Sequence, residues 1–144
     1  QQAQEYFNQK KEEALFFLED VEVNYNKRRY KRASFYLHQA CENLFYTLRL
    51  VHTLKNSKQH NLSKLLGATS KYSPELKKIF PRKPQEEKRL FELLRLAYVE
   101  ARYNPKFVVT KEDIDALLPK VEKLRDVTEQ VCKTQIESYM QKEK

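Results

Sequence analysis

Two arginines alternate with two aromatic residues along one edge of a predicted helix at residues 85–103. Arg95 and Arg102 lie seven residues apart, so they share a side of the helix with Phe91 and Tyr98. A guanidinium group can hold a phosphate through two parallel hydrogen bonds, and a neighbouring tyrosine can stack on a base. The edge therefore suits a phosphate or nucleotide, although both arginines could instead lie over the core and pair with carboxylates of neighbouring helices.

Residues around this edge extend the candidate site. Tyr103 closes the helix and Lys106 follows it, while His38 lies on another predicted helix, one turn from Glu42. A histidine in such a position is more often structural than catalytic, because its ring nitrogens are readily satisfied by neighbouring groups. The predicted nucleotide- or phosphate-binding set consists of Arg95, Tyr98, Arg102, Tyr103, Lys106 and His38.

The histidines and cysteines do not suggest a metal centre. His52 and His60 have no cysteine or acid at ligand spacing. Cys41 and Cys132 fall on apolar stripes of predicted helices, where a free thiol behaves as a small hydrophobic residue. We expect both cysteines in the core, and we expect neither a metal nor a cofactor.

The charge of the chain favours an anionic partner. The formal net charge is +8 and the pI is near 9.4. Residues 27–32 contain five cations in six positions, at the start of a predicted helix. Two interpretations stay open: a solvated cluster that pairs with Glu19, Asp20 and Glu22, or an anion site that also uses the helix N–H groups.

Composition sets the fold class that must position these residues. One glycine and five prolines in 144 residues leave few sites for hairpin turns, and no Gly/Ser-rich or Pro-rich linker divides the chain. We predict an all-α protein, an up-and-down helical bundle of about five helices, in a single domain over residues 1–144. Apolar periodicity and capping residues place helical segments near 3–23, 31–54, 61–72, 75–80, 85–103 and 111–140.

No apolar run approaches the length of a membrane span, and no signal-peptide pattern is present. We therefore expect a cytoplasmic protein without a membrane partner. The first residue is Gln rather than Met, so we expect that the chain could be a fragment of a longer protein with a domain upstream.

The segment 31–54 predicts the central helix, and it is apolar on two faces. Phe35, Tyr46 and Leu50 form the second face, opposite the main core stripe. A second apolar face needs a second covering element, so we predict either a homodimer interface or an additional helix of the same chain over these three residues.

Three segments, in this order and spacing, resemble the HEPN domain family. They are Gln39-Ala40-Cys41-Glu42 on the central helix, His60-Asn61-Leu62 at the start of a helix, and Ala101-Arg102-Tyr103 at the end of one. The resemblance implies a helical bundle that usually dimerises and acts on nucleotides or RNA. Many members are metal-independent ribonucleases that use an Arg, four to six residues and then a His. Others accompany a minimal nucleotidyltransferase in toxin–antitoxin modules, or bind nucleotides, as in sacsin.

The chain departs from the ribonuclease motif, because no histidine follows Arg95 or Arg102 at the required spacing. Arg32 and His38 have that spacing but lie too early in the chain. We therefore predict a non-catalytic dimeric module that binds a nucleotide or RNA and works with a nucleotidyltransferase. The alternatives are a metal-independent ribonuclease using Arg95, Glu100 and Arg102 with an unconventional base, namely Glu100, His38 or His60, and a pure dimerisation module.

Overall fold

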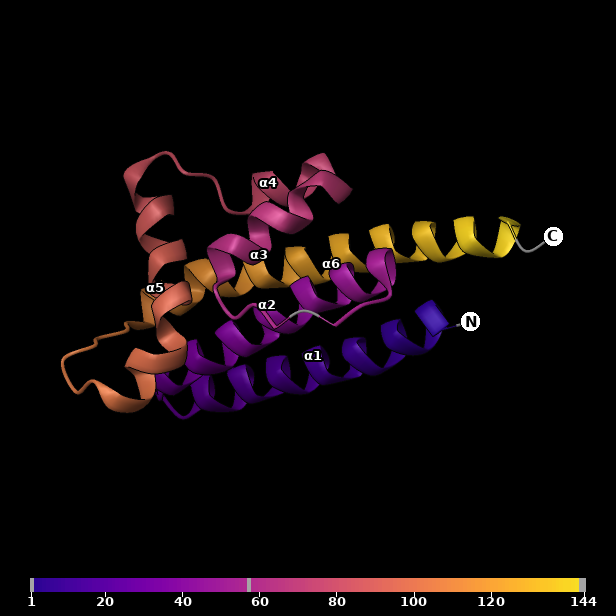
Figure 1. The fold of residues 1–144 in the computed structure, drawn as a ribbon. Helices are drawn as coiled ribbons and strands as arrows, with labels where there is room; N and C mark the ends of the chain where they lie inside the picture. The colour runs from indigo at the N-terminus through magenta and orange to yellow at the C-terminus, as the bar shows by residue number, and fades with distance from the viewer. Residues whose placement is uncertain (1, 57, 143–144) are drawn as a thin grey trace.

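The computed structural model describes residues 2–56 and 58–142, and all regular elements in these ranges are helical (Figure 1). The all-α bundle is confirmed, with six α-helices in the described ranges where about five were predicted. The elements are α1 (Gln2–Asn26), α2 (Tyr30–Thr53), α3 (Leu62–Thr69), a 3-10 turn (Ser70–Tyr72), α4 (Pro74–Ile79), α5 (Gln85–Tyr103) and α6 (Lys111–Lys142).

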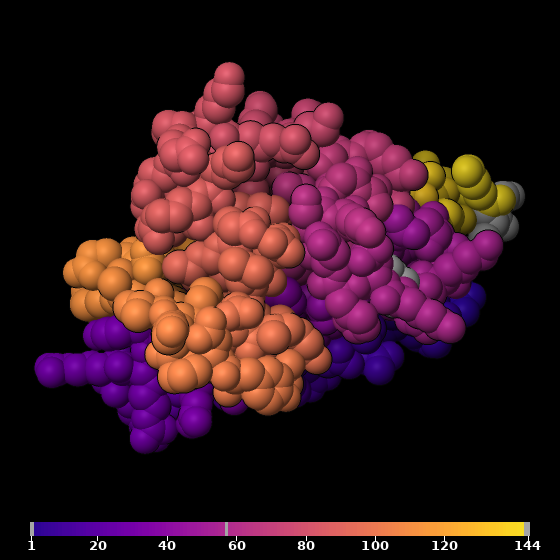
Figure 2. Space-filling view, turned by 60° about the vertical axis from the view of Figure 1, so that its left-hand side comes forward, coloured from indigo at the N-terminus to yellow at the C-terminus, as the bar shows by residue number. Residues whose placement is uncertain are grey.

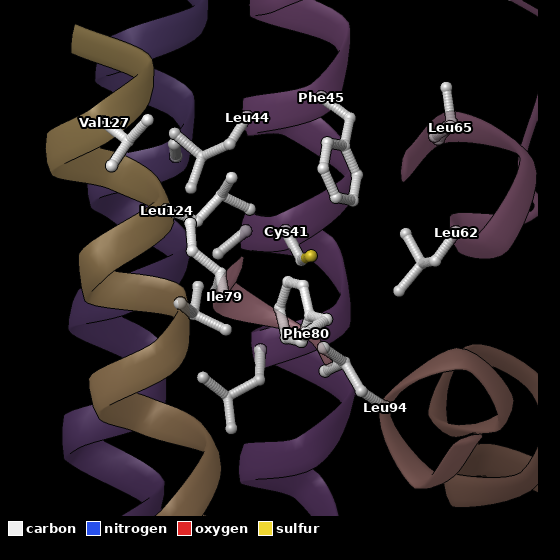
Figure 3. Close-up of a cluster of buried hydrophobic side chains, with 14 of the residues drawn as sticks. Cys41, Leu44, Phe45, Leu62, Leu65, Ile79, Phe80, Leu94, Leu124 and Val127 are labelled. Atoms are coloured by element: carbon white, nitrogen blue, oxygen red, sulfur yellow. The ribbon is translucent and has the colours of Figure 1, made fainter. Parts of the chain in front are cut away.

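Helix α2 is the centre of the fold, packing against α1, α3, α5 and α6. In Figure 1, α1, α2 and α6 run alongside one another, and α5 crosses them at one end. Figure 3 shows Leu44 of α2 beside Leu124 of α6, while Phe45 points toward Leu62 and Leu65 of α3. These contacts enclose α2, so all of its side chains except Arg32 and Thr53 are at least half-buried.

Side-chain caps fix where the helices begin, as the sequence predicts. The Asn61 carboxamide accepts hydrogen bonds from two backbone N–H groups of α3, and the Ser73 hydroxyl caps α4 with Pro74 in the first turn. At the start of α6, Asp113 N–H donates to Thr110 Oγ1, and Thr110 N–H donates to Asp113 Oδ2. This reciprocal pair fixes the end of the connector that follows α5.

The two cysteines lie in the core, as predicted. Cys41 and Cys132 are fully buried and are not linked to one another. Burial raises the pKa of both thiols, that of Cys132 to about 12. Within the described ranges, none of the helices combines the length and the apolar character that crossing a membrane requires.

Candidate functional site

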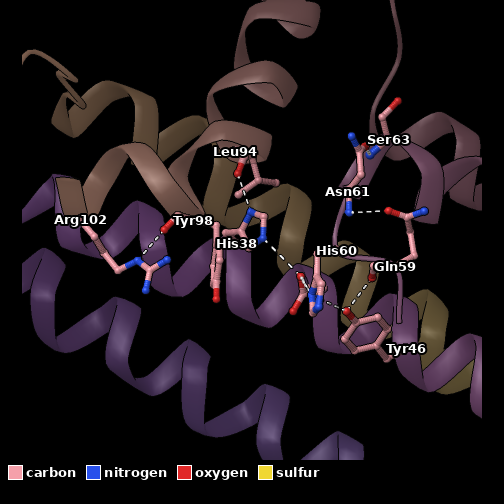
Figure 4. A network of polar contacts seen from close by, with 10 residues as sticks. His38, Tyr46, Gln59, His60, Asn61, Ser63, Leu94, Tyr98 and Arg102 are labelled. Atoms are coloured by element: carbon pink, nitrogen blue, oxygen red, sulfur yellow. Dashed lines mark hydrogen bonds and ion pairs between the residues drawn. The ribbon is translucent and has the colours of Figure 1, made fainter. Parts of the chain in front are cut away.

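One strip of α2 faces α5 and the segment that precedes α3. We call it the site face of α2, and it consists of Phe35, His38, Glu42 and Tyr46, which recur every three or four residues. In Figure 4, Arg102 and Tyr98 lie at one end of this face, His38 lies in the middle, and His60 and Tyr46 lie at the other end.

Arg102 lies among three aromatic rings. Its Cζ is 4.3 Å from the ring centre of Tyr98, 4.8 Å from that of Tyr103 and 5.4 Å from that of Phe35. Phe35 and Tyr98 stack on each other, with their ring centres 5.9 Å apart. This arrangement attracts the guanidinium cation to the ring faces and limits the positions that it can take.

The outer nitrogens of Arg102 remain available. Only Nε is engaged, donating to the carbonyl oxygen of Tyr98 at 2.7 Å. No carboxylate in the described part of the chain lies within ion-pairing distance of Arg102, which is exposed. A fixed, exposed guanidinium without an acidic partner can accept a phosphate or another anion.

Arg95 has a different role, although it lies on the same edge of α5. Its side chain forms two hydrogen bonds with the Glu92 carboxylate, from Nε at 3.0 Å and from one terminal nitrogen. These bonds lower the pKa of Glu92 and raise that of Arg95. Phe91, one turn earlier, packs against Phe80. The residues of the predicted edge therefore have different partners: Arg95 pairs with Glu92, whereas Arg102 contacts Tyr98.

Glu100 and Lys106 lie close to Arg102 in sequence, but each has a local contact. The Glu100 carboxylate accepts a hydrogen bond from Asn104 Nδ2 at 2.5 Å. The Lys106 backbone N–H donates to Asn104 Oδ1 at 2.9 Å, and its side chain is exposed. Arg95, Glu100 and Arg102, the residues of the catalytic alternative, thus contact three different partners.

His38 connects α2 to α5 inside the protein. It is 2% exposed, and its Nδ1 donates to the Leu94 carbonyl oxygen at 2.9 Å. The ring of Tyr98 lies against it at 5.4 Å. Its Nε2 makes no hydrogen bond and lies 3.6 Å from Glu42 Oε2. This is the geometry of a structural histidine, and it leaves little ring surface for a ligand.

The far end of the site face joins two of the sequence motifs. His60 Nδ1 lies 3.5 Å from Glu42 Oε2 and 3.1 Å from Tyr46 Oη. Tyr46 Oη donates to the Gln59 carbonyl oxygen at 2.6 Å. Burial, with a smaller effect of the Glu42 charge, raises the pKa of Tyr46 to about 12. Glu42 was not among the predicted site residues, although it belongs to the Gln39–Glu42 motif and its contact His60 opens the His60–Leu62 motif.

An acidic groove borders the site face on its other side, between α1 and α2. The groove has a volume of about 330 Å³. Its lining includes three carboxylates and two phenylalanines: Glu13, Phe16, Phe17, Asp20, Gln39, Glu42 and Asn43. The carboxylates would repel a phosphate, so this groove does not suit an anionic ligand.

The residues predicted to form a second apolar face have different environments. Phe35 is half-buried against Tyr98 of α5, and Tyr46 is half-buried beside His60. Leu50 is 2% exposed, so its side chain is already covered within the chain. Elements of the same chain cover part of this face, and only Phe35 and Tyr46 keep surface that a partner could contact.

Among the described residues, no group of three or more histidines, cysteines and acids is arranged to hold a metal ion. A family model described as HEPN domain matches residues 8–131 of the chain. The matched range contains the three motifs and the whole site face. None of the curated proteins compared with the chain matches it.

Proposed function

Because the chain belongs to the HEPN domain family, we propose that it is a non-catalytic, dimeric module that binds a nucleotide or RNA through Arg102. The observation that carries this proposal is the exposed guanidinium, held by Tyr98, Tyr103 and Phe35 and without a carboxylate partner in the described residues. Arg95 on the same helix, by contrast, pairs with Glu92.

The geometry indicates how a nucleotide would bind. The outer N–H groups of Arg102 would donate to phosphate oxygens as a fork. Tyr103 is 71% exposed, and its free ring surface would stack on the base. Lys106 follows the end of α5 and adds a second positive charge near the phosphate. These roles match the predicted set, except that Arg95 and His38 are engaged elsewhere.

Binding is favoured over catalysis because, among the described residues of one chain, no exposed histidine lies at the Arg102 end. Cleavage at the 2′-hydroxyl needs a titratable group within hydrogen-bonding reach of that hydroxyl. His38 is buried. His60 contacts Tyr46, and Tyr46 lies eleven residues after Phe35, about 16 Å along α2. In one protomer, Arg102 and His60 are therefore too far apart to act on the same phosphate.

Dimer formation is the second part of the proposal. Phe35 and Tyr46 retain exposed surface, and α1 carries the exposed apolar side chains of Leu15, Phe16 and Val23. Light scattering at micromolar concentration should give twice the mass of the chain. The mass of a single chain, unchanged with concentration, would contradict a dimer.

The third part concerns a partner, and it rests on the resemblance to family members that accompany a nucleotidyltransferase. We extend the proposal to such an enzyme, present either upstream in the same polypeptide or as a separate chain. Co-purification of the full gene product, followed by mass spectrometry and an assay for nucleotide transfer, would test this part independently of the binding site.

The direct test of binding is a titration with a fluorescent nucleoside triphosphate, followed by anisotropy at low and high salt. We expect affinity to fall as salt rises, because phosphate contacts release counterions. A protein that binds neither nucleoside triphosphates nor short RNA at low salt would contradict the proposed function.

A further inference from the structure

The densest group of cations in the chain lies at the turn between α1 and α2, about one helical turn before Phe35. Helix α1 ends at Asn26 and α2 begins at Tyr30, and the turn is closed by a 2.8 Å hydrogen bond from Arg29 N–H to the Asn24 carbonyl. Arg28 has a φ of 60°, a conformation that fits glycine better. We call residues 27–32 the basic turn.

The cations of the basic turn lack acidic partners in the described part of the chain. The carboxylates at the end of α1, on Glu19, Asp20 and Glu22, make no ion pair with them, so the expected pairing is not found. Four of the five cations are exposed. Lys31 is half-buried, and its Nζ donates to a backbone carbonyl oxygen. The first turn of α2 also has no acid and no side-chain cap, so the helix dipole adds to the positive field.

The basic turn lies beside the Arg102 end of the site face. Lys31 Nζ donates to the Asn104 carbonyl oxygen at 2.6 Å, and Asn104 directly follows the helix that carries Arg102. Figure 2 shows the purple start of α2 next to the orange end of α5 on one surface of the molecule. Tyr30 precedes Phe35 by about 7.5 Å along α2, so the two places adjoin without coinciding.

Aromatic rings accompany these cations. Tyr25 and Tyr30 form an edge-to-face pair with ring centres 5.8 Å apart, and both are half-buried. The Tyr25 hydroxyl donates to Asp115 at 2.6 Å, which fixes its ring. Cations interleaved with fixed rings are typical of surfaces that bind unpaired bases and the phosphates between them.

We propose that the basic turn is a second contact surface for the ligand, and that together with Arg102 it selects a single-stranded nucleic acid over a mononucleotide. The inference rests on the proposed function, because it takes the Arg102 end as the first phosphate contact. It adds the class of ligand: a strand of at least two nucleotides, with one phosphate at Arg102 and the next toward Arg28, Arg29 and Arg32.

The test is a length series measured by fluorescence anisotropy at low salt. The probes are labelled oligouridylates of two, four and eight nucleotides, with uridine monophosphate as a competitor and oligothymidylates as the DNA counterpart. The variant Arg28→Ser/Arg29→Ser removes two charges from the turn. The matched control Lys64→Ser/Lys77→Ser removes two exposed, unpaired lysines from α3 and α4.

We expect the octamer to bind the unaltered protein about tenfold tighter than the monophosphate, and the turn variant to lose about tenfold in octamer affinity. The slope of log affinity against log salt should fall by about 1 to 2 in the turn variant. Affinity for the monophosphate should not change, and the control variant should bind the octamer within about twofold of the unaltered protein. Thermal unfolding followed by circular dichroism checks that both variants fold.

Two results would overturn the inference. One is an octamer affinity no greater than that of the monophosphate, and the other is equal weakening by the turn variant and its control. Either result leaves the proposed function intact if the monophosphate still binds through Arg102. If none of the probes bound, that result would contradict both the inference and the proposed function.

Discussion

Replacing Arg102 with alanine should separate binding from folding. In the folded protein the guanidinium is exposed and makes ring contacts at 4.3 to 5.4 Å and one hydrogen bond to a backbone carbonyl. An exposed cation–π contact contributes about 0.5–1 kcal/mol, so Tm should fall by about 5 °C or less. A lost charge-assisted contact with phosphate costs about 1–3 kcal/mol, equivalent to about 5- to 150-fold in Kd.

The assay is anisotropy with a labelled octauridylate, together with a thermal melt of each variant. Arg95→Ala is the matched control, because it removes the same side chain from the same helix but breaks only an exposed pair with Glu92. We expect that variant to bind within about twofold of the unaltered protein. Arg102→Lys keeps the charge without the planar fork and should show an intermediate loss.

One pattern of results would contradict binding through Arg102. If Arg102→Ala left the affinity unchanged while lowering Tm by more than Arg95→Ala does, the Arg102 side chain would be a structural clamp between α2 and α5. The exposed guanidinium would then be a consequence of packing rather than a binding group.

Three other predictions use the remaining features. The protein should not cleave single-stranded RNA in chelator at neutral pH, because no exposed histidine among the described residues of one chain lies near Arg102; cleavage that Arg102→Ala abolishes would contradict this. Burial acts to raise the pKa of Asp113, but hydrogen bonds from Thr110 and Arg89 outweigh it and leave the pKa below its usual value. Its contribution to stability should therefore be present above pH ~4 and lost as pH falls further. In urea titrations, the free energy of unfolding of Asp113→Asn should fall less between neutral and acidic pH than that of the unaltered protein. Cys41 and Cys132 should not react with a thiol reagent at pH 8 until the protein unfolds, because burial raises both pKa values; rapid modification of the native protein would contradict their burial.

Local signals predicted the helices and their ends well. Thr110 and Asp113 form the expected capping pair, and α5 spans the predicted residues 85–103. Capping and periodicity involve residues within a few positions of each other, so the sequence alone contains the information. The local sequence also explains why Arg95 is paired and Arg102 is not. Glu92 lies three residues before Arg95, whereas Val99 occupies that position before Arg102.

Contacts between distant segments could not be predicted in this way. The pattern of α2 put Leu50 on the same side as Phe35, but the packing of other elements buries Leu50. The contact of His60 with Glu42 depends on the path of the connector between α2 and α3. Periodicity describes the faces of one helix, and it does not determine which faces the neighbouring elements cover.

Because α2 packs against four other helices, a change in its length should disturb the fold more than a substitution of one of its residues. Deleting one residue between Leu37 and Glu42 would rotate every later position by about 100°. Glu42 and Tyr46 would turn away from His60, and core residues such as Leu44 would leave their places between α1 and α6. A change of seven residues rotates the helix by only about 20°. The same change would also move every later residue by about 10.5 Å along the helix axis, so it too would separate Glu42 and Tyr46 from His60. An insertion or deletion of any length in this helix should therefore lower stability more than a single substitution on its site face.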